Sequence, residues 1–519
     1  MDAHGFFFLF CCAATFLLAG AQRGFISIDC GLNDTATYIN QLNNLTYVSD
    51  DGFIDSGMNG LIDPTSIGKG SNKVYFTVRF FPNYKRNCYQ LPATVDTKYI
   101  VRATFLYGNY DGLDTPPSFD LHLGVNVWET VNLTDNNKPF WTELVVQAEA
   151  RFLYVCLVNT GHGTPFISSL KLRPLPQNMY APANSSLYLA LKTFRRVDLG
   201  AKQPSWYPTD RLDRIWESNY DGYGTPYITS LPVTESANLM FGLPSVVMQT
   251  AVYSPDEIRV NWTGGVDDRF HLFLEFADVV PPTAGGSRTM KVQMNGEDWG
   301  DASIFYLHTN VLYSTTPLNN ASEYSFSIRS ANASDEGAVL NSFEIYKVVT
   351  FNGSATEEGD VMAVTAMKEY YQLKKNWIAD PCLPFPWDGL TCDGSQTVGL
   401  DLSSSGLSGM ISRHIFSLTK LKTLNLSTNN LHGSVPPFLL EMPYLVNIDL
   451  SSNNLSGPIP DLMRERVRSG KLTLRIEGNP HICLKDQCTQ DQKSHAGKNV
   501  VSVISMVISL VLLVCLIFI

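Results

Sequence analysis

The region from residue 24 to about residue 350 consists of short apolar or alternating runs separated by Gly, Pro, Asn and Asp. Examples are YIVRATFLY (99–107), SFDLHLGV (118–125), FHLFLEF (270–276) and TMKVQMN (289–295). Runs of this length are typical of β-strands, and many of them between turn residues predict β-sandwiches. We therefore expect a mainly β protein.

The same region contains an internal repeat. Three landmarks recur at a constant offset of 171 residues: Tyr99–Phe105 with Phe270–Phe276, Phe119–Leu123 with Met290–Met294, and Trp128 with Trp299. A constant offset predicts two copies of one fold, lobe 1 (24–178) and lobe 2 (185–350), joined by a Pro-rich segment. The recurring tryptophan predicts a core role in each lobe.

Residues 398–480 follow a second period, of 24 residues. The complete unit reads LxxLxLSxNxLxGxxP and occurs at 421–436 and 445–460. This pattern predicts a plant-type leucine-rich repeat solenoid of about three to four units. Its leucines would fill the core, and Asn429 and Asn453 would bond successive turns through their side-chain amides.

A helix and a disulfide-tied cap are expected between the sandwiches and the repeats, over residues 360–397. Asp360 is expected to cap a helix that runs to about Lys375. A solenoid needs a cap at each end, because its terminal repeats otherwise expose apolar core. CLKDQC (483–488) is the predicted C-terminal cap.

The first apolar run at the N-terminus, Phe6–Leu18, is followed by Ala19, Gly20 and Ala21. This arrangement predicts a cleaved signal peptide over residues 1–21. An uncleaved anchor is the alternative interpretation, because the usual positive residues before the apolar run are missing.

The C-terminal run, residues 500–519, holds no charged residue. It would form about 30 Å of helix at about 1.5 Å per residue, which is the thickness of a bilayer's hydrocarbon core. We expect a single-pass plasma-membrane protein with an extracellular N-terminal region. A glycosylphosphatidylinositol anchor signal is the alternative, although only Lys498 and Asn499 form its polar spacer.

The formal net charge is -11, and no Lys/Arg cluster is present, which argues against nucleic-acid binding. Glycosylation is expected, because N-x-S/T sequons occur in every segment. They are Asn33, Asn44, Asn132, Asn184, Asn261, Asn320, Asn332, Asn352, Asn425 and Asn454. A composition rich in Asn, Ser and Thr is the alternative origin of several of these triplets.

The cysteines between the two apolar runs are odd in number, so one of them is expected to be free. Cys382–Cys392 and Cys483–Cys488 are the close pairs that we expect to be bridged, and Cys30–Cys88 is the third expected bridge. Cys156 lies in an apolar run and is expected to be a buried thiol.

Several motifs together carry a family resemblance. They are ISIDCG (26–31), FIDSG (53–57), RNCY (86–89), RATFLYGNYDG (102–112), CLVNTGHGTPFISSLKLRPL (156–175) and DRIW (213–216). In this order they resemble the malectin-like ectodomain of plant receptor-like kinases. The stretch WIADPCLPFPWDGLTCD (377–393) resembles the GDPC-type motif of symbiosis-type receptor kinases, with Ala379 where that motif has Gly.

The resemblance implies tandem malectin-like jelly-roll β-sandwiches, a cell-surface location and a ligand that is a cell-wall carbohydrate or a secreted peptide. We expect the repeats to contact a co-receptor kinase. The alternatives are the truncated ectodomain of a receptor Ser/Thr kinase, a glycosylphosphatidylinositol-anchored co-receptor, and a glycan-processing enzyme.

The sequence lacks a P-loop, HExxH, GxSxG, an EF-hand loop and the kinase motifs, so we expect neither an enzyme nor a cofactor. Asp50, Asp51, Asp55 and Asp63 form an acidic cluster that could hold a hard cation. Solvated loop carboxylates are the preferred interpretation, so we expect no metal.

The candidate ligand-binding residues are Tyr107, Asn109, Tyr110 and Asp111. Sugar recognition uses an aromatic face beside a fixed carboxylate or amide, and this turn supplies both. A turn with buried tyrosines is the alternative interpretation. The cleft between the lobes is the other candidate site, because domain junctions favour pockets.

Overall fold

The computed structural model describes residues 24–483, except for 34–36, 64–66, 68–71, 188, 235–240, 282–286, 332–336, 352 and 354. The predicted signal peptide (1–21), the apolar tail (500–519), Cys488, Asn332 and Asn352 lie outside the described residues. Within the described part, no helix has both the length and the apolar character needed to span a membrane.

Lobe 1 is a β-sandwich whose core lies between a large sheet and the sheet β6-β11-β8-β9, with a small sheet, β12-β5-β4, beside them. Its elements are β1 (Ile26–Asp29), β2 (Thr37–Ile39), β3 (Thr46–Ser49), β4 (Met58–Leu61), η2 (Lys73–Tyr75), β5 (Thr77–Phe80), β6 (Arg86–Pro92), β7 (Lys98–Phe105), β8 (Ser118–Leu123), β9 (Asn126–Asn132), β10 (Phe140–Gln147), β11 (Phe152–His162), β12 (Phe166–Ile167) and β13 (Ser169–Leu175). Trp128 is buried in this core.

Lobe 2 repeats the arrangement. Its elements are η3 (Ser185–Leu187), β14 (Leu189–Leu199), β15 (Glu217–Asn219), β16 (Thr225–Ile228), α1 (Ser245–Met248), β17 (Thr250–Ser254), β18 (Ile258–Thr263), β19 (Phe270–Phe276), β20 (Arg288–Met294), β21 (Glu297–Ile304), β22 (Asn310–Tyr313), β23 (Glu323–Ser330), β24 (Ala338–Leu340) and β25 (Ser342–Thr350). The order β18-β23-β20-β21 matches β6-β11-β8-β9, and β24-β17-β16 matches β12-β5-β4. The internal repeat is therefore a repeat of topology, although Trp299 is only half-buried against the core of lobe 2.

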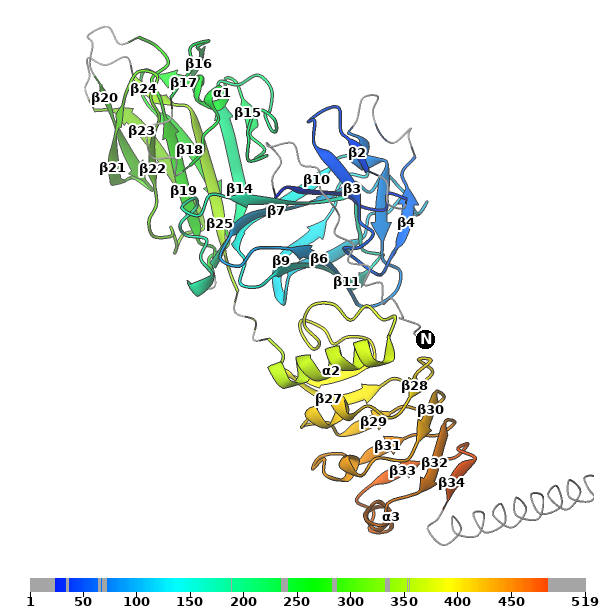
Figure 1. The fold of residues 1–519 in the computed structure, drawn as a ribbon. Helices are drawn as coiled ribbons and strands as arrows, with labels where there is room; N and C mark the ends of the chain where they lie inside the picture. Colours follow the sequence, from blue (N-terminus) through cyan, green and yellow to red (C-terminus); the bar gives the residue numbers. More distant parts are fainter. Residues whose placement is uncertain are drawn as a thin grey trace, which may run out of the picture.

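One continuous sheet crosses the boundary between the lobes. Its order is β2-β3-β1-β13-β7-β10-β14-β25-β19-β22, with β15 on β14. Strand β10 of lobe 1 pairs antiparallel with β14 of lobe 2, with Leu144 opposite Lys192. The lobes are thus joined by backbone hydrogen bonds as well as by the chain between them, and Figure 1 shows β14 running beside lobe 1.

The segment before the repeats forms helix α2 (Glu358–Tyr371) and a small disulfide-tied cap. Glu357, and not Asp360, occupies the N-cap position, and the helix ends at Tyr371 because Gln372 is left-handed. The carboxylate of Asp360 instead accepts a hydrogen bond from the backbone of Thr397 at 2.6 Å. The two tryptophans of the cap, Trp377 and Trp387, stack with ring centroids 5.3 Å apart.

The repeats form a short solenoid with two sheets, whose strands are parallel except for the antiparallel pair β26 and β27. Its elements are β26 (Leu390–Asp393), β27 (Gln396–Asp401), β28 (Ser408–Gly409), η4 (Arg413–Ser417), β29 (Thr423–Asn425), β30 (Asn430–Gly433), η5 (Pro437–Leu440), β31 (Asn447–Asp449), β32 (Asn454–Pro458), α3 (Asp461–Arg468), β33 (Thr473–Arg475) and β34 (His481–Cys483). Asn429 donates to the carbonyl of Leu402 at 2.8 Å, and Asn453 donates to that of Leu426 at 2.9 Å. The predicted amide ladder is confirmed, and Asn479 extends it by one turn.

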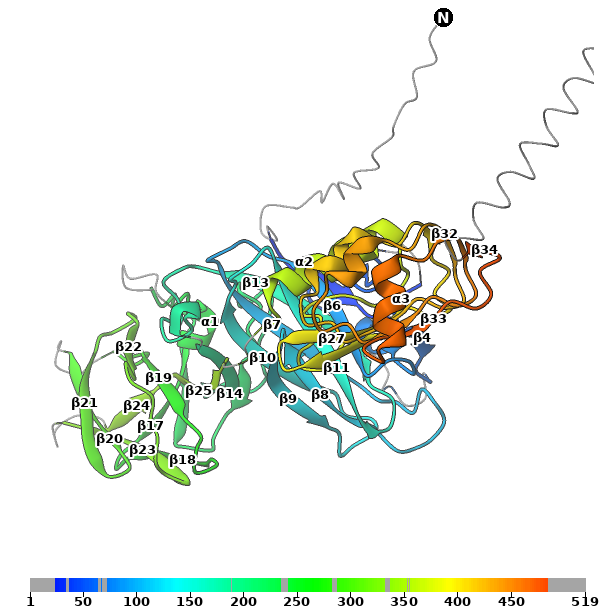
Figure 2. The same cartoon turned by 90° about the horizontal axis from the view of Figure 1, so that it is seen from below.

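The solenoid meets lobe 1 through the cap, whereas lobe 2 lies away from it (Figures 1 and 2). Arg86 of β6 is buried and donates to the backbone carbonyls of Asp380 and Leu383 in the cap. Burial without a bonded carboxylate lowers the pKa of Arg86 to about 10. The Asp380 carboxylate bonds the backbone of Thr356, Cys382 and Leu383, which holds this loop together.

The prediction for the lobe 1 cysteines was wrong. Cys88 and Cys156 form a disulfide, and Cys30 is the buried free thiol. Cys88 and Cys156 are register partners on the antiparallel strands β6 and β11, with Cα atoms 4.0 Å apart, so the strand pairing brings them together. Cys382–Cys392 is confirmed, and Cys483 is disulfide-bonded.

The double substitution Cys88→Ala/Cys156→Ala should lower the free energy of unfolding by about 4 kcal/mol, because the bridge closes a loop with a sequence separation of 68. The pairing is checked by comparing the denaturant unfolding of this double variant with that of Cys30→Ala. Cys30→Ala should leave every bridge intact in non-reducing peptide mapping. Loss of a bridge in Cys30→Ala would contradict the assignment.

Ala379→Gly should stabilise the cap by roughly 0.5–1 kcal/mol, because Ala379 has a φ of 67° and a left-handed alanine is strained. Gly389→Ala is the opposite control in the same cap: its φ is 90°, and an added Cβ would lie 2.4 Å from the carbonyl oxygen of Asp401. Denaturant unfolding should move the two variants in opposite directions. A less stable Ala379→Gly protein would show that the alanine is not strained.

Candidate ligand-binding site between the lobes

A pocket of about 480 Å³ lies where lobe 1 meets the first loops of lobe 2. Lobe 1 contributes Leu42 and Asn43 from the turn between β2 and β3, residues around η2, and side chains from β7, β10 and β13. Lobe 2 contributes the crossing segment, which we define as residues 204–217. The pocket volume lies within the range of about 300–1,000 Å³ that is usual for small-molecule sites.

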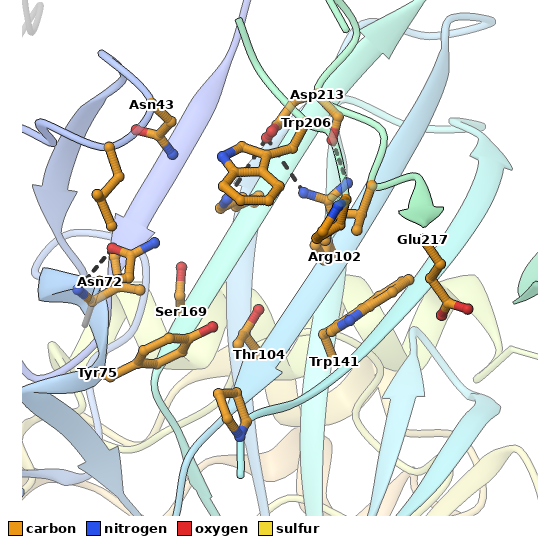
Figure 3. A pocket seen from close by; sticks show the side chains of 16 residues that line it. Asn43, Asn72, Tyr75, Arg102, Thr104, Trp141, Ser169, Trp206, Asp213 and Glu217 are labelled. Carbon is orange, nitrogen blue, oxygen red and sulfur yellow. Dashed lines mark hydrogen bonds and ion pairs between the residues drawn. The ribbon is translucent and has the colours of Figure 1, made fainter. Parts of the chain in front are cut away.

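Aromatic side chains surround this pocket. Figure 3 shows Tyr75 and Trp141 on opposite sides, with Thr104 and Ser169 between them and Trp206 at the upper end. Trp206 is 40% exposed, so much of its ring surface faces solvent. Asn72 and Glu217 add an amide and a carboxylate to the lining.

The floor of the pocket is a group of buried charges. Arg102 donates from Nε and Nη2 to Glu143 Oε2 at 2.8 and 2.5 Å, and it also bonds the backbone carbonyl of Asp213. The Asp213 carboxylate accepts from Arg173 Nε at 2.9 Å, and Lys171 Nζ lies 3.7 Å away. Asp213 has a φ of 59°, so the chain is turned sharply to bring this carboxylate to the arginines.

The charges continue across the lobe boundary. Arg196 of β14 contacts Glu143 of β10 at 2.9 Å and Glu344 of β25 at 2.6 Å. We call Arg102, Glu143, Arg196 and Glu344 the buried charge ladder, because they alternate in sign across four adjacent strands. On the next strand, burial and the neighbouring Glu344 raise the pKa of Glu275 well above its usual range.

The arginines keep the acidic members of this group ionised. Burial would raise the pKa of Glu143, but Arg196 and Arg102 outweigh it and bring the pKa to about 2. Burial also opposes ionisation of Asp213, and Lys171, Arg173 and Arg102 together hold its pKa well below the usual range. The carboxylates of Glu143 and Asp213 therefore stay ionised throughout the physiological pH range.

The crossing segment is held in place by Asp210. Its carboxylate accepts hydrogen bonds from Arg214 Nε at 2.7 Å, from Trp216 Nε1 at 2.8 Å and from the backbone of Leu212 at 2.7 Å. Arg214 also donates to the carbonyl of Phe241 at 2.9 Å. The DRIW motif thus fixes a loop over the large sheet and positions Trp206 and Glu217 at the pocket.

The four binding residues predicted from the sequence lie together in one turn of lobe 1, outside the pocket lining. Tyr107 is buried, and its hydroxyl group donates to Asp111. Asn109 Oδ1 accepts from the backbone of Asp114 at 2.8 Å, and the ring of Tyr110 packs against Phe166. These groups are mainly used to build the turn.

Part of the predicted acidic cluster forms ion pairs and hydrogen bonds within lobe 1. Asp50 is fully buried, accepts from Arg79 at 2.7 and 2.9 Å, and accepts from Tyr89 at 2.9 Å. Asp51 lies 3.1 Å from Arg79. In the part of the chain that the structure describes, no group of three His, Cys, Asp or Glu side chains is arranged to hold a metal ion.

The sequence predicts a candidate site at the lobe junction but does not indicate which residues line the pocket there. Trp141 and Trp206 are far apart in the chain and are not at equivalent positions of the repeat, so no pattern joined them. The signal that could have found them is the pair of motifs RATFLYGNYDG and DRIW. Both supply charges to the floor of the pocket, through Arg102 and Asp213.

Two known protein families match parts of this chain. The malectin-like domain matches residues 28–348, and the leucine-rich repeat family matches residues 420–442 and 444–465. This chain belongs to the malectin-like domain family. The match covers both lobes and includes the crossing segment.

Curated relatives match this chain over almost its whole length. A leucine-rich repeat receptor-like serine/threonine-protein kinase of Arabidopsis thaliana is 39% identical over 515 residues, which are 95% of this chain and 58% of that protein. Another Arabidopsis thaliana receptor-like kinase is 39% identical over 525 residues, 97% of this chain and 60% of its own length. The chain thus spans about three fifths of these relatives, and neither matched family is a kinase.

Solved structures share the fold of the lobes. The ANX2 ectodomain from Arabidopsis thaliana superimposes with a TM-score of 0.53 at 16% identity, covering 63% of this chain and 97% of that one. The plant receptor-like kinase FER gives a TM-score of 0.51 at 16% identity, with 63% and 96% covered. The malectin-like chain is thus similar in fold to plant receptor ectodomains.

Glu143→Gln should lower the free energy of unfolding by about 3–5 kcal/mol, because it leaves Arg102 and Arg196 with an uncompensated buried charge. The contribution of Glu143 is present above its usual pKa of 4.5 and is lost as the pH falls toward about 2. The difference between wild type and variant should therefore narrow over this pH range in denaturant unfolding.

Glu129→Gln is the matched control, because Glu129 makes a partly exposed ion pair with Lys192 at 2.5 Å. Glu129→Gln should lower the free energy of unfolding by less than about 1 kcal/mol. Equal losses of unfolding free energy in the two variants would show that the buried charge ladder stabilises the protein no more than an exposed ion pair does.

Proposed function

We propose that this chain is the extracellular ligand-binding region of a non-enzymatic receptor-like protein at the plasma membrane. Its ligand is a cell-wall carbohydrate bound in the pocket between the lobes, with a secreted peptide as the other ligand class. The observation that carries the proposal is the ring of Tyr75, Trp141 and Trp206 around fixed polar groups. The receptor-like kinase relatives support the cell-surface role.

The lining of the pocket suits a sugar ring. The flat aromatic faces can cover the apolar C–H faces of a pyranose, and each stacked ring contributes about 0.5–1.5 kcal/mol beyond the area that it buries. The hydroxyl group of Thr104, the amide of Asn72 and the carboxylate of Glu217 can bond the sugar hydroxyl groups. The buried charges beneath the pocket already form ion pairs with one another, so binding of a neutral ligand leaves no charge without a partner.

The repeats are proposed to contact a co-receptor kinase. Register places Asp401, Asn425, Asp449 and Arg475 in one row across β27, β29, β31 and β33. Asn425 donates to Asp401 at 3.1 Å, and Arg475 lies 3.7 Å from Asp449. This polar row gives a partner a defined pattern of donors and acceptors.

The proposal also concerns the membrane anchor and any region of the protein on the inner side of the membrane. A transmembrane helix is preferred over a glycosylphosphatidylinositol anchor, and release by phosphatidylinositol-specific phospholipase distinguishes them. The relatives named above are kinases, so the alternative is the outer part of a receptor Ser/Thr kinase. The transcript beyond the codon for Ile519 decides whether kinase motifs follow.

Binding of the purified full-length chain to a glycan array and to a secreted-peptide pool tests the ligand. Trp206→Ala should weaken sugar binding about tenfold, the equivalent of about 1.4 kcal/mol, because it removes one stacking face. Tyr444→Ala, at a 47% exposed aromatic residue of the solenoid, should leave binding unchanged.

Two outcomes would count against the carbohydrate proposal. One is the absence of any sugar bound by the wild-type protein, and the other is equal affinity in the two variants. Peptide binding that is lost in Trp206→Ala would assign the pocket to the peptide class instead.

A further inference from the structure

One of the sequons lies beside the pocket between the lobes. Asn44-Leu45-Thr46 forms the end of the turn between β2 and β3, and the two residues before it, Leu42 and Asn43, line the pocket. Of the sequon asparagines that the structure describes, Asn44 alone directly follows lining residues. A group attached to its side chain would therefore stand at the edge of the pocket.

The turn that carries Asn44 is held rigidly. The backbone N–H of Asn40 donates to the carbonyl of Leu45 at 2.9 Å, and that of Asn44 donates to the carbonyl of Asn40 at 2.7 Å. Asn43 Oδ1 accepts from the backbone of Leu45 at 3.2 Å. The Asn40 amide donates to Asn72 Oδ1 at 2.5 Å, which ties the turn to a second lining residue.

The modifiable side chains of this sequon face solvent. Asn44 and Thr46 are exposed, whereas Leu45 and Tyr47 on either side of Thr46 are buried. Asn425 is different, because it is half-buried. The turn around Asn44 can thus carry a bulky group without loss of core packing.

Apolar surface is exposed on both sides of the pocket opening. Leu42 is 53% exposed on the turn, and Trp206 is 40% exposed on the crossing segment. Figure 3 shows Asn43 and Trp206 at the same upper end of the pocket. A sugar chain that begins at Asn44 therefore has an aromatic face within the pocket opening to stack on.

We propose that Asn44 carries an N-linked glycan that folds over the pocket opening, packs against Trp206 and competes with the ligand. Coverage of the pocket by the glycan does not depend on the proposed function. Competition with a ligand rests on the proposed function. A short tether holds a group at an effective concentration on the order of 1 mM. A tethered sugar with a dissociation constant near 1 mM would occupy the site about half of the time and weaken a free ligand about twofold.

The test uses substitutions at Thr46, which keep Asn44 and its turn. Thr46→Val removes the sequon, and Thr46→Ser retains it at the same exposed strand position. Thr263→Val is a second control, because it removes the Asn261 sequon on an exposed part of lobe 2. The full-length proteins are made in plant cells, and glycopeptide mass spectrometry measures the occupancy of Asn44 and Asn261.

Hydroxyl-radical footprinting then reports the accessibility of individual tryptophans. Trp206 should be oxidised about twofold faster in Thr46→Val than in wild type or Thr46→Ser, because the glycan covers one of its faces. Trp299 of lobe 2 should be oxidised at the same rate in all proteins. Thr263→Val should leave the rate of Trp206 unchanged.

An unoccupied Asn44 in the wild-type protein, or equal oxidation of Trp206 in Thr46→Val and Thr46→Ser, would overturn the proposal. The glycan array, repeated with Thr46→Val, tests competition, and sugar binding should strengthen about twofold. Equal binding would refute competition. If no protein binds any sugar, the carbohydrate proposal fails, while the footprint still decides whether the glycan covers the pocket.

Discussion

The buried charge ladder is the constraint on which the arrangement of the two lobes depends. Arg102, Glu143, Arg196 and Glu344 lie on four adjacent strands of one sheet, and the contact between Glu143 and Arg196 crosses the lobe boundary. Desolvation makes each of these charges expensive unless its partner is present. The lobes therefore cannot slide or separate without stranding a charge, which gives the shared sheet one register.

The same charges give the pocket its floor. Arg102 belongs both to the ladder and to the group around Asp213, so lobe 1 and the crossing segment of lobe 2 are tied to one guanidinium. Asp210 anchors the rest of this segment through Arg214 and Trp216. The walls that carry the aromatic rings are thus pre-organised, which limits the entropy that a ligand must lose on binding.

The solenoid is connected to this assembly through helix α2 and the cap, which contact lobe 1. Arg86 bonds two carbonyl groups of the cap, and the cap covers the first repeat with its stacked tryptophans. The pocket lies at the other junction of lobe 1, with the crossing segment. Lobe 1 therefore stands between the proposed ligand site and the proposed co-receptor surface, and a partner bound to the repeats would meet lobe 1 before lobe 2.

Local periodicity by itself determined the repeats, their asparagine ladder, the duplicated sandwich and the Cys382–Cys392 bridge, because each depends on residues close in sequence or on a regular spacing. Tertiary structure decided the rest. Pairing of β6 with β11 selected Cys156, and not Cys30, as the partner of Cys88. Pairing of β10 with β14 joined the lobes and brought Trp141 near Trp206. The turn at Tyr107, which the sequence also indicates as a binding site, lies outside the lining of this pocket, and its polar groups form hydrogen bonds with one another. Strand pairing between distant segments leaves no periodic trace in the chain, because it is set by burial and charge compensation in the folded protein.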